Sequence, residues 1–321
     1  MTVRYLSEHD TKTLLAWPNV IACLAAAYAR ADDPSAAPPR VVARSGGMWL
    51  RALTAISQNG DCMGAKLIVK GAPRSADHFI ALWDQKSGAL ACLMSAKSIT
   101  AMRTAGTSAV AVDAMATRSA PLRVAVLGSG REAQTHLGAV ASVRAIASVQ
   151  VYSPTRENRE RFADTYTKQL STQCRAVNTP AAAVDGANLV IAAARSHDET
   201  PILSGTWLQP GMFVISIGST VPEQREVDAE VVARVDVIVS DVVAEVAHET
   251  GDMIAARAAG VAFEHKLVSL TDVVRARVDA RQQDDKIVMF KSVGSGLQDI
   301  AVSEMCYAAA LRAGAGTVLP I

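Results

Sequence analysis

A glycine-rich loop between an apolar run and a helical segment constrains this chain more than any other feature. Residues 124–133 read VAVLGSGREA, a GxGxxA pattern directly before the helical segment 134–143. Gly128 permits a tight turn, Gly130 lets the backbone approach a pyrophosphate, and Ala133 keeps the helix close to the strand. The free N–H groups and dipole of the helix N-terminus favour phosphate. The residues predicted to bind a dinucleotide are Gly128, Ser129, Gly130, Arg131, Glu132 and Ala133.

Strand-like apolar runs alternate with helical segments from Pro121 onward. Such alternation is typical of parallel βαβ units with right-handed crossovers. It predicts an α/β fold with a doubly wound parallel sheet of the Rossmann type. The expected strands lie at 122–127, 149–152, 174–177, 189–193, 213–217 and 237–239.

The segments before and after this region have a different pattern. Helices are expected over 9–31 and 98–117, and short apolar runs between them, separated by Gly and Asp turns, predict an antiparallel sheet. The runs lie at 48–53, 65–69, 80–83 and 89–94. The tail predicts a strand at 287–291 and a closing helix at 296–313. At ~100–200 residues per domain, 321 residues suggest two domains.

The end of the second strand in the alternating region distinguishes NADP from NAD. Proteins that bind NAD usually place Asp or Glu there, roughly 20 residues after the loop, to bind the ribose 2′-hydroxyl. This chain has YSPTR at 152–156, with no carboxylate. Two hydroxyls and a guanidinium suit a 2′-phosphate, so Ser153, Thr155 and Arg156 predict NADP(H), with NAD as the alternative. In the competing interpretation, Thr155 only caps the next helix and Arg156 is solvated.

The composition argues against several partners and sites. A net charge of +1 gives no overall field for nucleic acid or an anionic membrane. Five scattered cysteines without a CxxC pair favour reduced thiols and argue against zinc. No run of ~18 uninterrupted apolar residues is present, and Asp10, Pro18 and Asn19 are atypical of a signal peptide around residues 14–31. We therefore expect a cytoplasmic protein with no metal site and no membrane or nucleic-acid partner.

Several further motifs, in a fixed order, extend the pattern beyond the glycine-rich loop. They are Pro38-Pro-Arg40-Val, Gly64-Ala-Lys66-Leu67, Ala101-Met-Arg103-Thr104-Ala105, the loop from Gly128 to His136, Pro201-Ile-Leu203, Gly218-Ser-Thr-Val-Pro222-Glu-Gln-Arg-Glu226 and Phe290-Lys291-Ser-Val-Gly294. On these motifs the chain resembles the ornithine cyclodeaminase/mu-crystallin family over nearly its full length. The resemblance implies a homodimer. It also implies a smaller α+β domain for substrate binding and dimerisation, residues 1–118 with 294–321, and an inserted NAD(P)-binding Rossmann domain at 119–293.

The resemblance also implies residues for the chemistry, since family members act on amino acids or cyclic imino acids. Arg40 and Arg103 match the family's carboxylate-binding arginines, and arginine can hold a carboxylate through two parallel hydrogen bonds. Lys66 matches a lysine that faces the substrate, where burial or nearby arginines would lower its pKa and permit proton transfer. Val293 and Gly294 join the expected cofactor residues. Without the resemblance, both arginines are interpreted as surface charges and Lys66 as a lysine pointing into solvent.

Thr220 is the main departure from the family pattern. True cyclodeaminases carry an aspartate at this position, whereas mu-crystallin-like reductases carry a small hydroxyl residue. Threonine cannot exchange protons at neutral pH, so the loss of the carboxylate argues against net cyclodeamination. We therefore expect an NAD(P)H-dependent reductase of a cyclic imino acid, such as Δ1-pyrroline-2-carboxylate or Δ1-piperideine-2-carboxylate. The catalytic candidates are Lys66, Arg40, Arg103 and Thr220.

Three alternative functions compete with this expectation. The first is an ornithine cyclodeaminase, converting L-ornithine to L-proline and ammonia, with another residue in place of the missing carboxylate. The second is an amino-acid dehydrogenase resembling alanine dehydrogenase, or an opine-like condensation. The third is a non-catalytic protein that binds NADPH or a small molecule. Among the other charged residues, Glu226 and Asp228 are expected at a helix start, and Glu245 and Glu249 on a solvated helix face.

Overall fold

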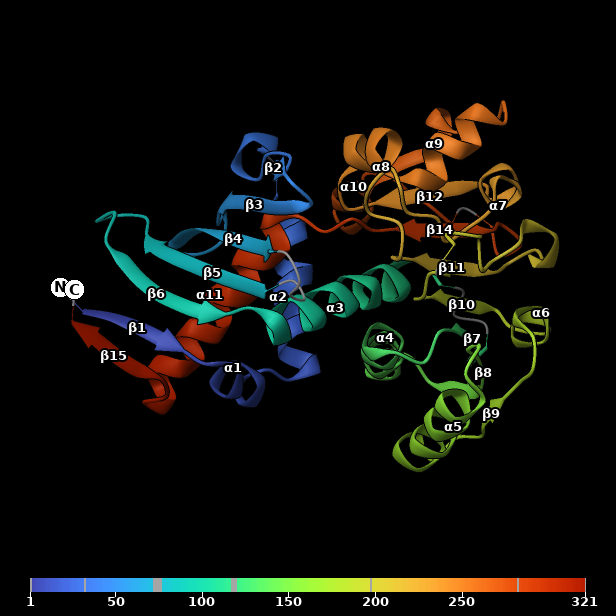
Figure 1. Cartoon of the computed structure of the whole chain (residues 1–321), viewed down its shortest axis with the longest axis horizontal. Coiled ribbons are helices and arrows are strands. Elements are labelled where there is room, and N and C mark those ends of the chain that lie inside the picture. The colour runs from blue at the N-terminus through green and yellow to red at the C-terminus, as the bar shows by residue number, and fades with distance from the viewer. Residues whose placement is uncertain are drawn as a thin grey trace. The chain divides into compact units, whose positions relative to one another are not determined.

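The computed structural model describes residues 2–31, 33–71, 77–116, 120–196, 198–281 and 283–320 (Figure 1). The chain divides into two compact units. Unit 1 combines Met1–Thr107 with Gly294–Ile321, and unit 2 is Ser108–Val293. The first division falls inside helix α3 (Lys97–Met115). The boundary expected between residues 118 and 119 lies outside the described residues.

Unit 1 is built on a seven-stranded sheet in the order β15-β1-β6-β5-β4-β3-β2. Neighbouring strands are antiparallel except for β1 and β6, which are parallel. The strands are β1 (Thr2–Leu6), β2 (Val41–Ser45), β3 (Met48–Ile56), β4 (Cys62–Lys70), β5 (Asp77–Asp84), β6 (Leu90–Ser95) and β15 (Thr317–Pro320). The four runs expected from the sequence correspond to β3 to β6, whereas β1, β2 and β15 are additional to the prediction.

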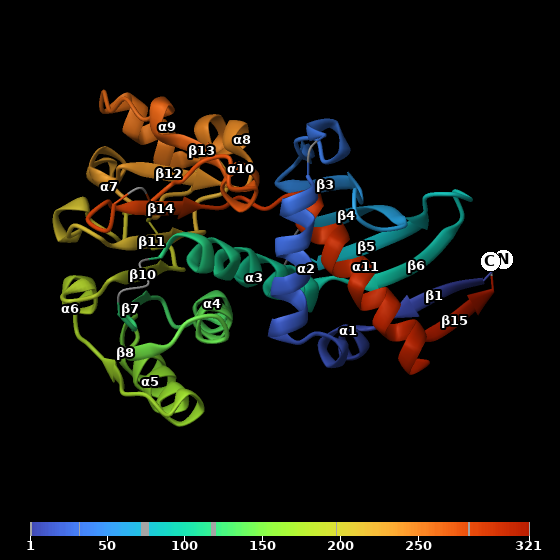
Figure 2. The ribbon, with the colours of Figure 1, turned by 180° about the vertical axis from the view of Figure 1, so that it is seen from behind.

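Helices cover one face of this sheet (Figure 2). Helix α11 (Gly296–Ala313) contacts β3, β4 and β5, and α2 (Trp17–Arg30) contacts α11. The strands turn alternate side chains toward these helices, so Ile68, Ile80 and Leu82 are buried. A short 3₁₀ turn follows α2 at Pro34–Ala36.

The single helix expected over 9–31 is in fact two helices, α1 (Glu8–Leu14) and α2. Leu15 and Ala16, between them, have extended backbones. Pro18 explains the break, because it has no N–H to donate to residue 14 and its ring would clash with that carbonyl. Proline is tolerated in the first turn of a new helix, where such an N–H would be unsatisfied in any case.

Unit 2 is built on an eight-stranded sheet in the order β13-β12-β14-β11-β10-β7-β8-β9, with every neighbouring pair parallel. The strands are β7 (Leu122–Leu127), β8 (Ile146–Tyr152), β9 (Cys174–Ala176), β10 (Leu189–Ala192), β11 (Phe213–Ser216), β12 (Val237–Ser240), β13 (Leu267–Ser269) and β14 (Val288–Lys291). The expected α/β fold with a parallel sheet is confirmed, and β13 is additional to the prediction.

Helices connect and cover these strands. They are α4 (Arg131–Ala141), α5 (Arg156–Leu170), α6 (Pro180–Val184), α7 (Ala229–Arg234), α8 (Val243–Glu249), α9 (Gly251–Ala258) and α10 (Leu270–Val274), with 3₁₀ turns at Gly205–Trp207 and Glu264–Lys266. Ala125 and Leu127 of β7 belong to an apolar core with residues of α6, α7 and α9. Within the described residues, no helix has the length and apolar character needed to cross a membrane.

Candidate active site

The glycine-rich loop joins β7 to α4 at the carboxyl end of the parallel sheet. Gly128 has a φ of 121°, and a Cβ there would lie 2.9 Å from the carbonyl oxygen of Ala193, so other residues would be strained. A Cβ on Gly130 would meet no heavy atom within 4 Å, which leaves space beside the helix N-terminus. Ala133, in the first turn of α4, is fully buried. The loop therefore fits a dinucleotide pyrophosphate, which its backbone N–H groups would hold.

The end of β8 is tied to this loop by a pair of hydroxyls. The Oγ of Ser129 donates a hydrogen bond to the Oγ of Ser153 at 2.9 Å, and Ser153 is buried. Thr155 occupies the N-cap position of α5, but its side chain makes no capping hydrogen bond. The hydroxyls expected near a cofactor ribose thus follow directly after β8.

Two exposed arginines flank the same region, and each lies beside a glutamate of its own helix. Arg156 Nε lies 2.7 Å from Glu160 Oε1, one turn along α5. Arg131 Nε lies 4.0 Å from Glu132 Oε1. Exposed ion pairs of this kind contribute about 0–1 kcal/mol, so either guanidinium can leave its glutamate for a phosphate at small cost.

In unit 1, Lys66 and Arg103 meet at the carboxylate of Asp299. Lys66 Nζ donates to Asp299 Oδ1 at 2.7 Å, and Arg103 Nε lies 2.9 Å from the same oxygen. The side chains of Lys66 and Asp299 are fully buried, and that of Arg103 is 6% exposed. Strand β4, helix α3 and the first turn of α11 supply the three residues. Two cations therefore share one buried carboxylate. The alternative interpretation, in which Lys66 and Arg103 point into solvent, is wrong.

Strand alternation explains why Lys66 lies inside. Gly64, Lys66 and Ile68 are buried on the face of β4 that α11 covers, while Leu67 is exposed on the other face. The small Gly64 is required here, because a Cβ would lie 2.4 Å from the carbonyl oxygen of Ala81. Lys66 thus occupies a position that would normally belong to a core apolar residue.

The guanidinium of Arg103 is held on two further sides. Arg103 Nη1 donates to Gln298 Oε1 at 2.5 Å, and Gln298 Nε2 donates to the Tyr28 hydroxyl at 2.8 Å. Gly294 has a φ of 83°, and a Cβ there would lie 2.5 Å from Arg103 Nη1. Gly294 is therefore needed both for its backbone conformation and for the space that the guanidinium fills.

The surroundings of Lys66 lower the pKa of its ammonium to about 7. Burial is the largest cause, because it penalises the charged form, and the positive charge of Arg103 adds to it. Asp299 acts in the opposite direction, and Arg51 contributes a smaller lowering. A lysine with a pKa near neutrality can exchange protons at physiological pH.

The remaining predicted residues lie in other parts of the two units. Arg40 is half-buried directly before β2. In unit 2, the N–H and hydroxyl of Thr220 donate to Gln224 Oε1 at 2.9 and 3.1 Å. The N–H of Val293 donates to Asp241 Oδ1 at 3.0 Å. The roles of these residues toward a substrate or cofactor stay predictions.

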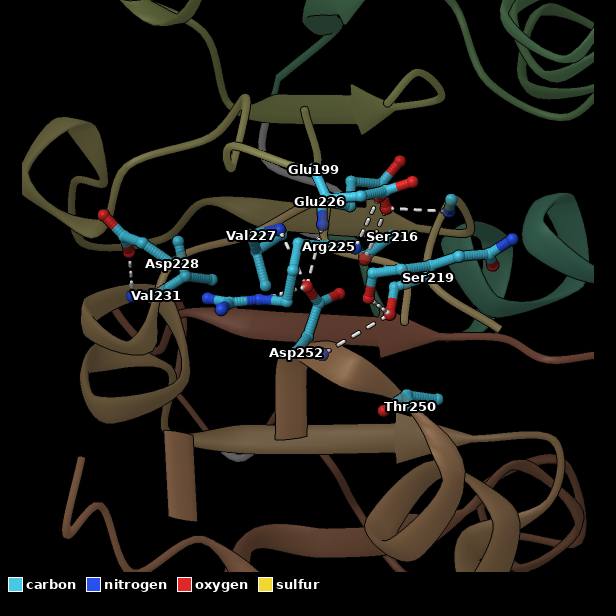
Figure 3. A network of polar contacts seen from close by, with 12 residues as sticks. Glu199, Ser216, Ser219, Arg225, Glu226, Val227, Asp228, Val231, Thr250 and Asp252 are labelled. Atoms are coloured by element: carbon cyan, nitrogen blue, oxygen red, sulfur yellow. Dashed lines mark hydrogen bonds and ion pairs between the residues drawn. The ribbon is translucent and has the colours of Figure 1, made fainter. Parts of the chain in front are cut away.

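A buried carboxyl group anchors the loop that carries Thr220 (Figure 3). Glu226 is fully buried, and its Oε2 accepts hydrogen bonds from Ser216 Oγ at 2.6 Å and from the N–H of Gly218 at 2.9 Å. Ser216 is the last residue of β11. The carboxyl group therefore ties the loop to the end of a central strand.

Asp252 and Lys291 complete this network. Asp252 Oδ1 accepts from the backbone N–H groups of Glu226 and Val227 at 2.8 and 3.2 Å (Figure 3). Lys291 Nζ donates to Asp252 Oδ2 at 2.7 Å and to Ser216 Oγ at 2.9 Å. Asp252 and Lys291 are both fully buried. Unit 2 thus contains a second buried lysine–aspartate pair, Lys291 with Asp252, at the carboxyl ends of β11 and β14.

Replacement of Glu226 by glutamine is expected to change how stability depends on pH. Burial raises the pKa of Glu226 from 4.5 to about 7, with a further rise from Asp252 that Lys291 and Ser216 oppose. The folded chain therefore binds more protons than the unfolded chain between these values. Relative to Glu226→Gln, the wild type should lose stability as pH rises through this window, by at most about 1.4 kcal/mol per pH unit.

Urea unfolding midpoints, measured from pH 5 to 7.5, check this expectation. Glu249→Gln on α8 is the control, because it makes the same chemical change at an exposed position. Parallel curves for the wild type and Glu226→Gln would show that Glu226 does not titrate in this range.

Two expectations for charged residues have opposite outcomes. Asp228 is the N-cap of α7 and accepts from the N–H of Val231 at 2.8 Å, which confirms a structural role at a helix start. The expected solvated face for Glu245 and Glu249 is wrong for Glu245, which is buried. The reason is that α8 contacts β12, β13 and α9, so one side of this short helix faces protein.

Asp299, Asp252 and Lys291 are absent from the residues predicted to be functional. An aspartate in the first turn of a helix usually complements the helix dipole, as Asp299 in α11 and Asp252 in α9 also do. That ordinary explanation gives no reason to look for a lysine partner far away in sequence. The Lys66–Asp299 contact joins residues 233 positions apart.

The fold and these residues define a class of protein: a Rossmann-type unit with a dinucleotide phosphate loop, and a second unit with a buried two-cation cluster. The model of the ornithine cyclodeaminase/mu-crystallin family matches residues 4–314. The chain belongs to this family, which confirms the resemblance found in its motifs.

Similar proteins include reductases of imino acids. The solved structure of Δ1-pyrroline-2-carboxylate reductase from Thermococcus litoralis, in complex with NADH and L-proline, is 27% identical with a TM-score of 0.91 and covers 98% of this chain and 99% of that one. Ketimine reductase mu-crystallin from Mus musculus is 27% identical over 265 residues, 81% of this chain and 80% of that protein. Δ1-pyrroline-2-carboxylate reductase from Bacillus cereus is 25% identical over 271 residues, 82% of each.

Proposed function

We propose that this protein is an NAD(P)H-dependent reductase of cyclic imino acids, with Δ1-pyrroline-2-carboxylate and Δ1-piperideine-2-carboxylate as the first candidates. The observation that carries the proposal is the buried Lys66–Asp299–Arg103 cluster. It combines a cation suited to a carboxylate with a lysine whose pKa lies near 7. The reductases to which the chain is similar act on substrates of this chemical class by name.

Each residue of the site has its own role in the proposed reduction. Arg103, with Arg40, binds the carboxylate of the imino acid and fixes the ring. Lys66 supplies the proton that the ring nitrogen takes up as the C=N bond becomes a CH–NH bond. A nicotinamide dinucleotide, when bound at the glycine-rich loop, provides the electron pair and the hydrogen that the imine carbon gains. In this proposal unit 2 binds the cofactor and unit 1 binds the substrate.

Thr220 favours reduction over cyclodeamination. Its N–H and hydroxyl both donate to Gln224 Oε1, so the side chain is a hydrogen-bond donor at a place where cyclodeaminases carry a carboxylate. A hydroxyl cannot accept the protons that ornithine releases as it closes to a ring and loses ammonia. Reduction of a ready-made C=N bond has no such requirement.

The test is the rate of NADPH and NADH oxidation with five- and six-membered cyclic imino acids, with L-ornithine as the control. We expect turnover of at least one imino acid and no formation of proline and ammonia from ornithine. Turnover of ornithine alone would establish a cyclodeaminase. NADPH binding without turnover of any substrate would establish a binding protein.

The hydroxyls and guanidinium after β8 favour NADP over NAD. Arg156→Ala should raise the KM for NADPH by up to about fivefold, the scale of one exposed ionic contact of about 1 kcal/mol, and leave the KM for NADH nearly unchanged. Glu160→Ala should act in the opposite direction, because it frees Arg156 from its ion pair. Steady-state kinetics with both cofactors measures this. An equal change in the KM for NADH and for NADPH would show that Arg156 does not bind the 2′-phosphate.

The face of the unit 1 sheet opposite α11 supports a homodimer. Register pairs Leu50 with Val69 and Leu67 with Phe79, so exposed apolar side chains continue from strand to strand. The exposed apolar residues on this face are Val41, Met48, Leu50, Ile56, Leu67, Val69, Phe79 and Leu93. Apolar patches that extend over several strands mark protein–protein interfaces, and we propose that a second copy of the chain covers this one.

Leu67→Glu should therefore convert the dimer into a monomer at micromolar concentration, because it places a charge at the middle of the proposed interface. Analytical ultracentrifugation gives the mass. Leu311→Glu is the matched control, since Leu311 is an exposed leucine on α11 and should leave the dimer intact. A wild-type monomer would refute the interface.

The cysteines support a reducing compartment, and we propose the cytoplasm. All five are free thiols, four of them buried. Burial raises the pKa of Cys62 and of Cys92 to about 12, so these thiols stay protonated and unreactive.

A further inference from the structure

The carboxylate of Asp299 is used in an unusual way for a buried ion pair. Its Oδ1 contacts both Lys66 Nζ and Arg103 Nε, while its Oδ2 is buried without a hydrogen-bond partner among the described residues. An ion pair that served stability alone would satisfy both oxygens, because an unsatisfied buried acceptor is costly. Asp252 shows the satisfied form, with both of its oxygens bonded. Glu226 also has one buried oxygen, Oε1, without a partner among the described residues, so the feature that distinguishes Asp299 is the pair of cations on its Oδ1.

The charges of the cluster do not cancel. Lys66 and Arg103 can carry two positive charges against the single negative charge of Asp299, and Arg51 of β3 adds a weaker positive field. An excess positive charge in a dry site disfavours the ammonium form of Lys66. The carboxylate of a bound acid would supply the missing negative charge. Counting Lys66, Arg103 and Asp299 alone, the empty cluster is neutral when Lys66 is uncharged, and the acid-bound cluster is neutral when Lys66 is charged.

We propose that Asp299 is a positioning residue that holds Lys66 beside Arg103, so that binding of an acid at Arg103 draws one proton onto Lys66. The proton then stands on the group that must donate it, and only after a substrate has bound. The idea rests on the proposed function for its substrate, but the coupling between anion and proton follows from the cluster itself. By linkage, the proton must tighten acid binding as much as the acid favours the proton.

The first experiment counts protons without any turnover. Pyrrole-2-carboxylate, a planar five-membered acid without a basic nitrogen, is titrated calorimetrically into the NADPH-loaded protein at pH 7.5 in buffers of different ionisation enthalpy. Because the pKa of Lys66 is lowered to about 7, a substantial share of the empty sites hold an uncharged Lys66 at this pH. We expect uptake of a large fraction of one proton per site. Lys66→Met should bind the acid with no uptake.

The second experiment isolates Asp299 through the pH profile of imine reduction. Asp299→Asn removes the negative charge beside Lys66, so the alkaline limb of kcat/KM should move about one to three pH units lower. Gln298→Glu adds a negative charge next to Arg103 and should move the limb higher. This second variant keeps the test valid if Asp299→Asn does not fold. The same substrate is used throughout, so its own ionisation is common to all profiles.

Asp252→Asn is the matched control, because it also removes the charge from a fully buried lysine–aspartate pair at 2.7 Å. It should lower stability without moving the alkaline limb. The proposal would be overturned if the pH profile of Asp299→Asn or Gln298→Glu differed from that of the wild type in height alone. It would also be overturned if the wild type bound pyrrole-2-carboxylate without taking up a proton. If the wild type takes up a proton with this acid but reduces no imine, the coupling stands and the proposed reaction fails.

Discussion

Lys66→Met should lower kcat for imine reduction by roughly 10²- to 10⁴-fold, the range attributed to a positioned general acid. Methionine matches the length of the lysine stem but carries no proton to donate. The variant should fold, because Lys66 lies at an apolar position among core residues, and Arg103 still pairs with Asp299. Initial rates at saturating NADPH and imino acid measure the effect.

Lys70→Met is the control for this variant, since Lys70 is an exposed lysine at the end of the same strand. It should retain the wild-type rate. The Kd for NADPH, followed by nicotinamide fluorescence, should be the same in all three proteins. A Lys66→Met variant with more than a tenth of the wild-type kcat would show that Lys66 is not the proton donor.

Arg103→Met should lower kcat/KM for a cyclic imino acid by roughly 10²- to 10³-fold, as expected when one member of a buried charge pair is lost. The loss should fall on substrates that carry a carboxylate. Δ1-Pyrroline, which lacks the carboxylate, should be reduced about equally by the variant and the wild type below pH 7, where Lys66 is charged in both proteins. Comparison of the two substrates therefore separates loss of acid recognition from general damage.

The same variant has a second expected effect with a definite sign. Arg103 lowers the pKa of Lys66, so its removal should raise that pKa and move the alkaline limb of the pH profile upward. Arg312→Met, at an exposed position of α11, is the control and should change neither substrate preference nor the pH profile. Equal losses for the acid and for Δ1-pyrroline would show that Arg103 does not bind the carboxylate.

Local sequence patterns predict most of the parallel sheet. Every strand expected between residues 122 and 239 is present. Strands β10 and β11 are fully buried apolar runs, whereas β8 and β9 near the edge of the sheet are only partly buried. The glycine-rich loop is equally local, since Gly128 and Gly130 act through their own backbone geometry. Strands β1 and β15 escape such reasoning, because they pair the two ends of the chain and neither end contains a signal for the other.

Site residues that belong to a sequence motif could be predicted. Site residues whose role depends on a contact with a residue distant in sequence could not. Lys66 and Arg103 come from motifs, whereas Asp299 gains its role from Lys66, 233 residues away. The burial of Glu245 likewise depends on the strands that α8 contacts rather than on the spacing of its charges. Helix and strand periodicity indicates which residues share a face. It does not indicate what lies opposite that face.

Transfer of a hydrogen to an imine carbon is the most direct test of the proposed reaction. The protein is incubated with Δ1-pyrroline-2-carboxylate and NADPH that carries deuterium on the transferable C4 position, and the product is examined by mass spectrometry. We expect proline with one deuterium, bound to Cα. Proline without the label would contradict the proposed reaction, as would the absence of both proline and, from a parallel incubation with Δ1-piperideine-2-carboxylate, pipecolate.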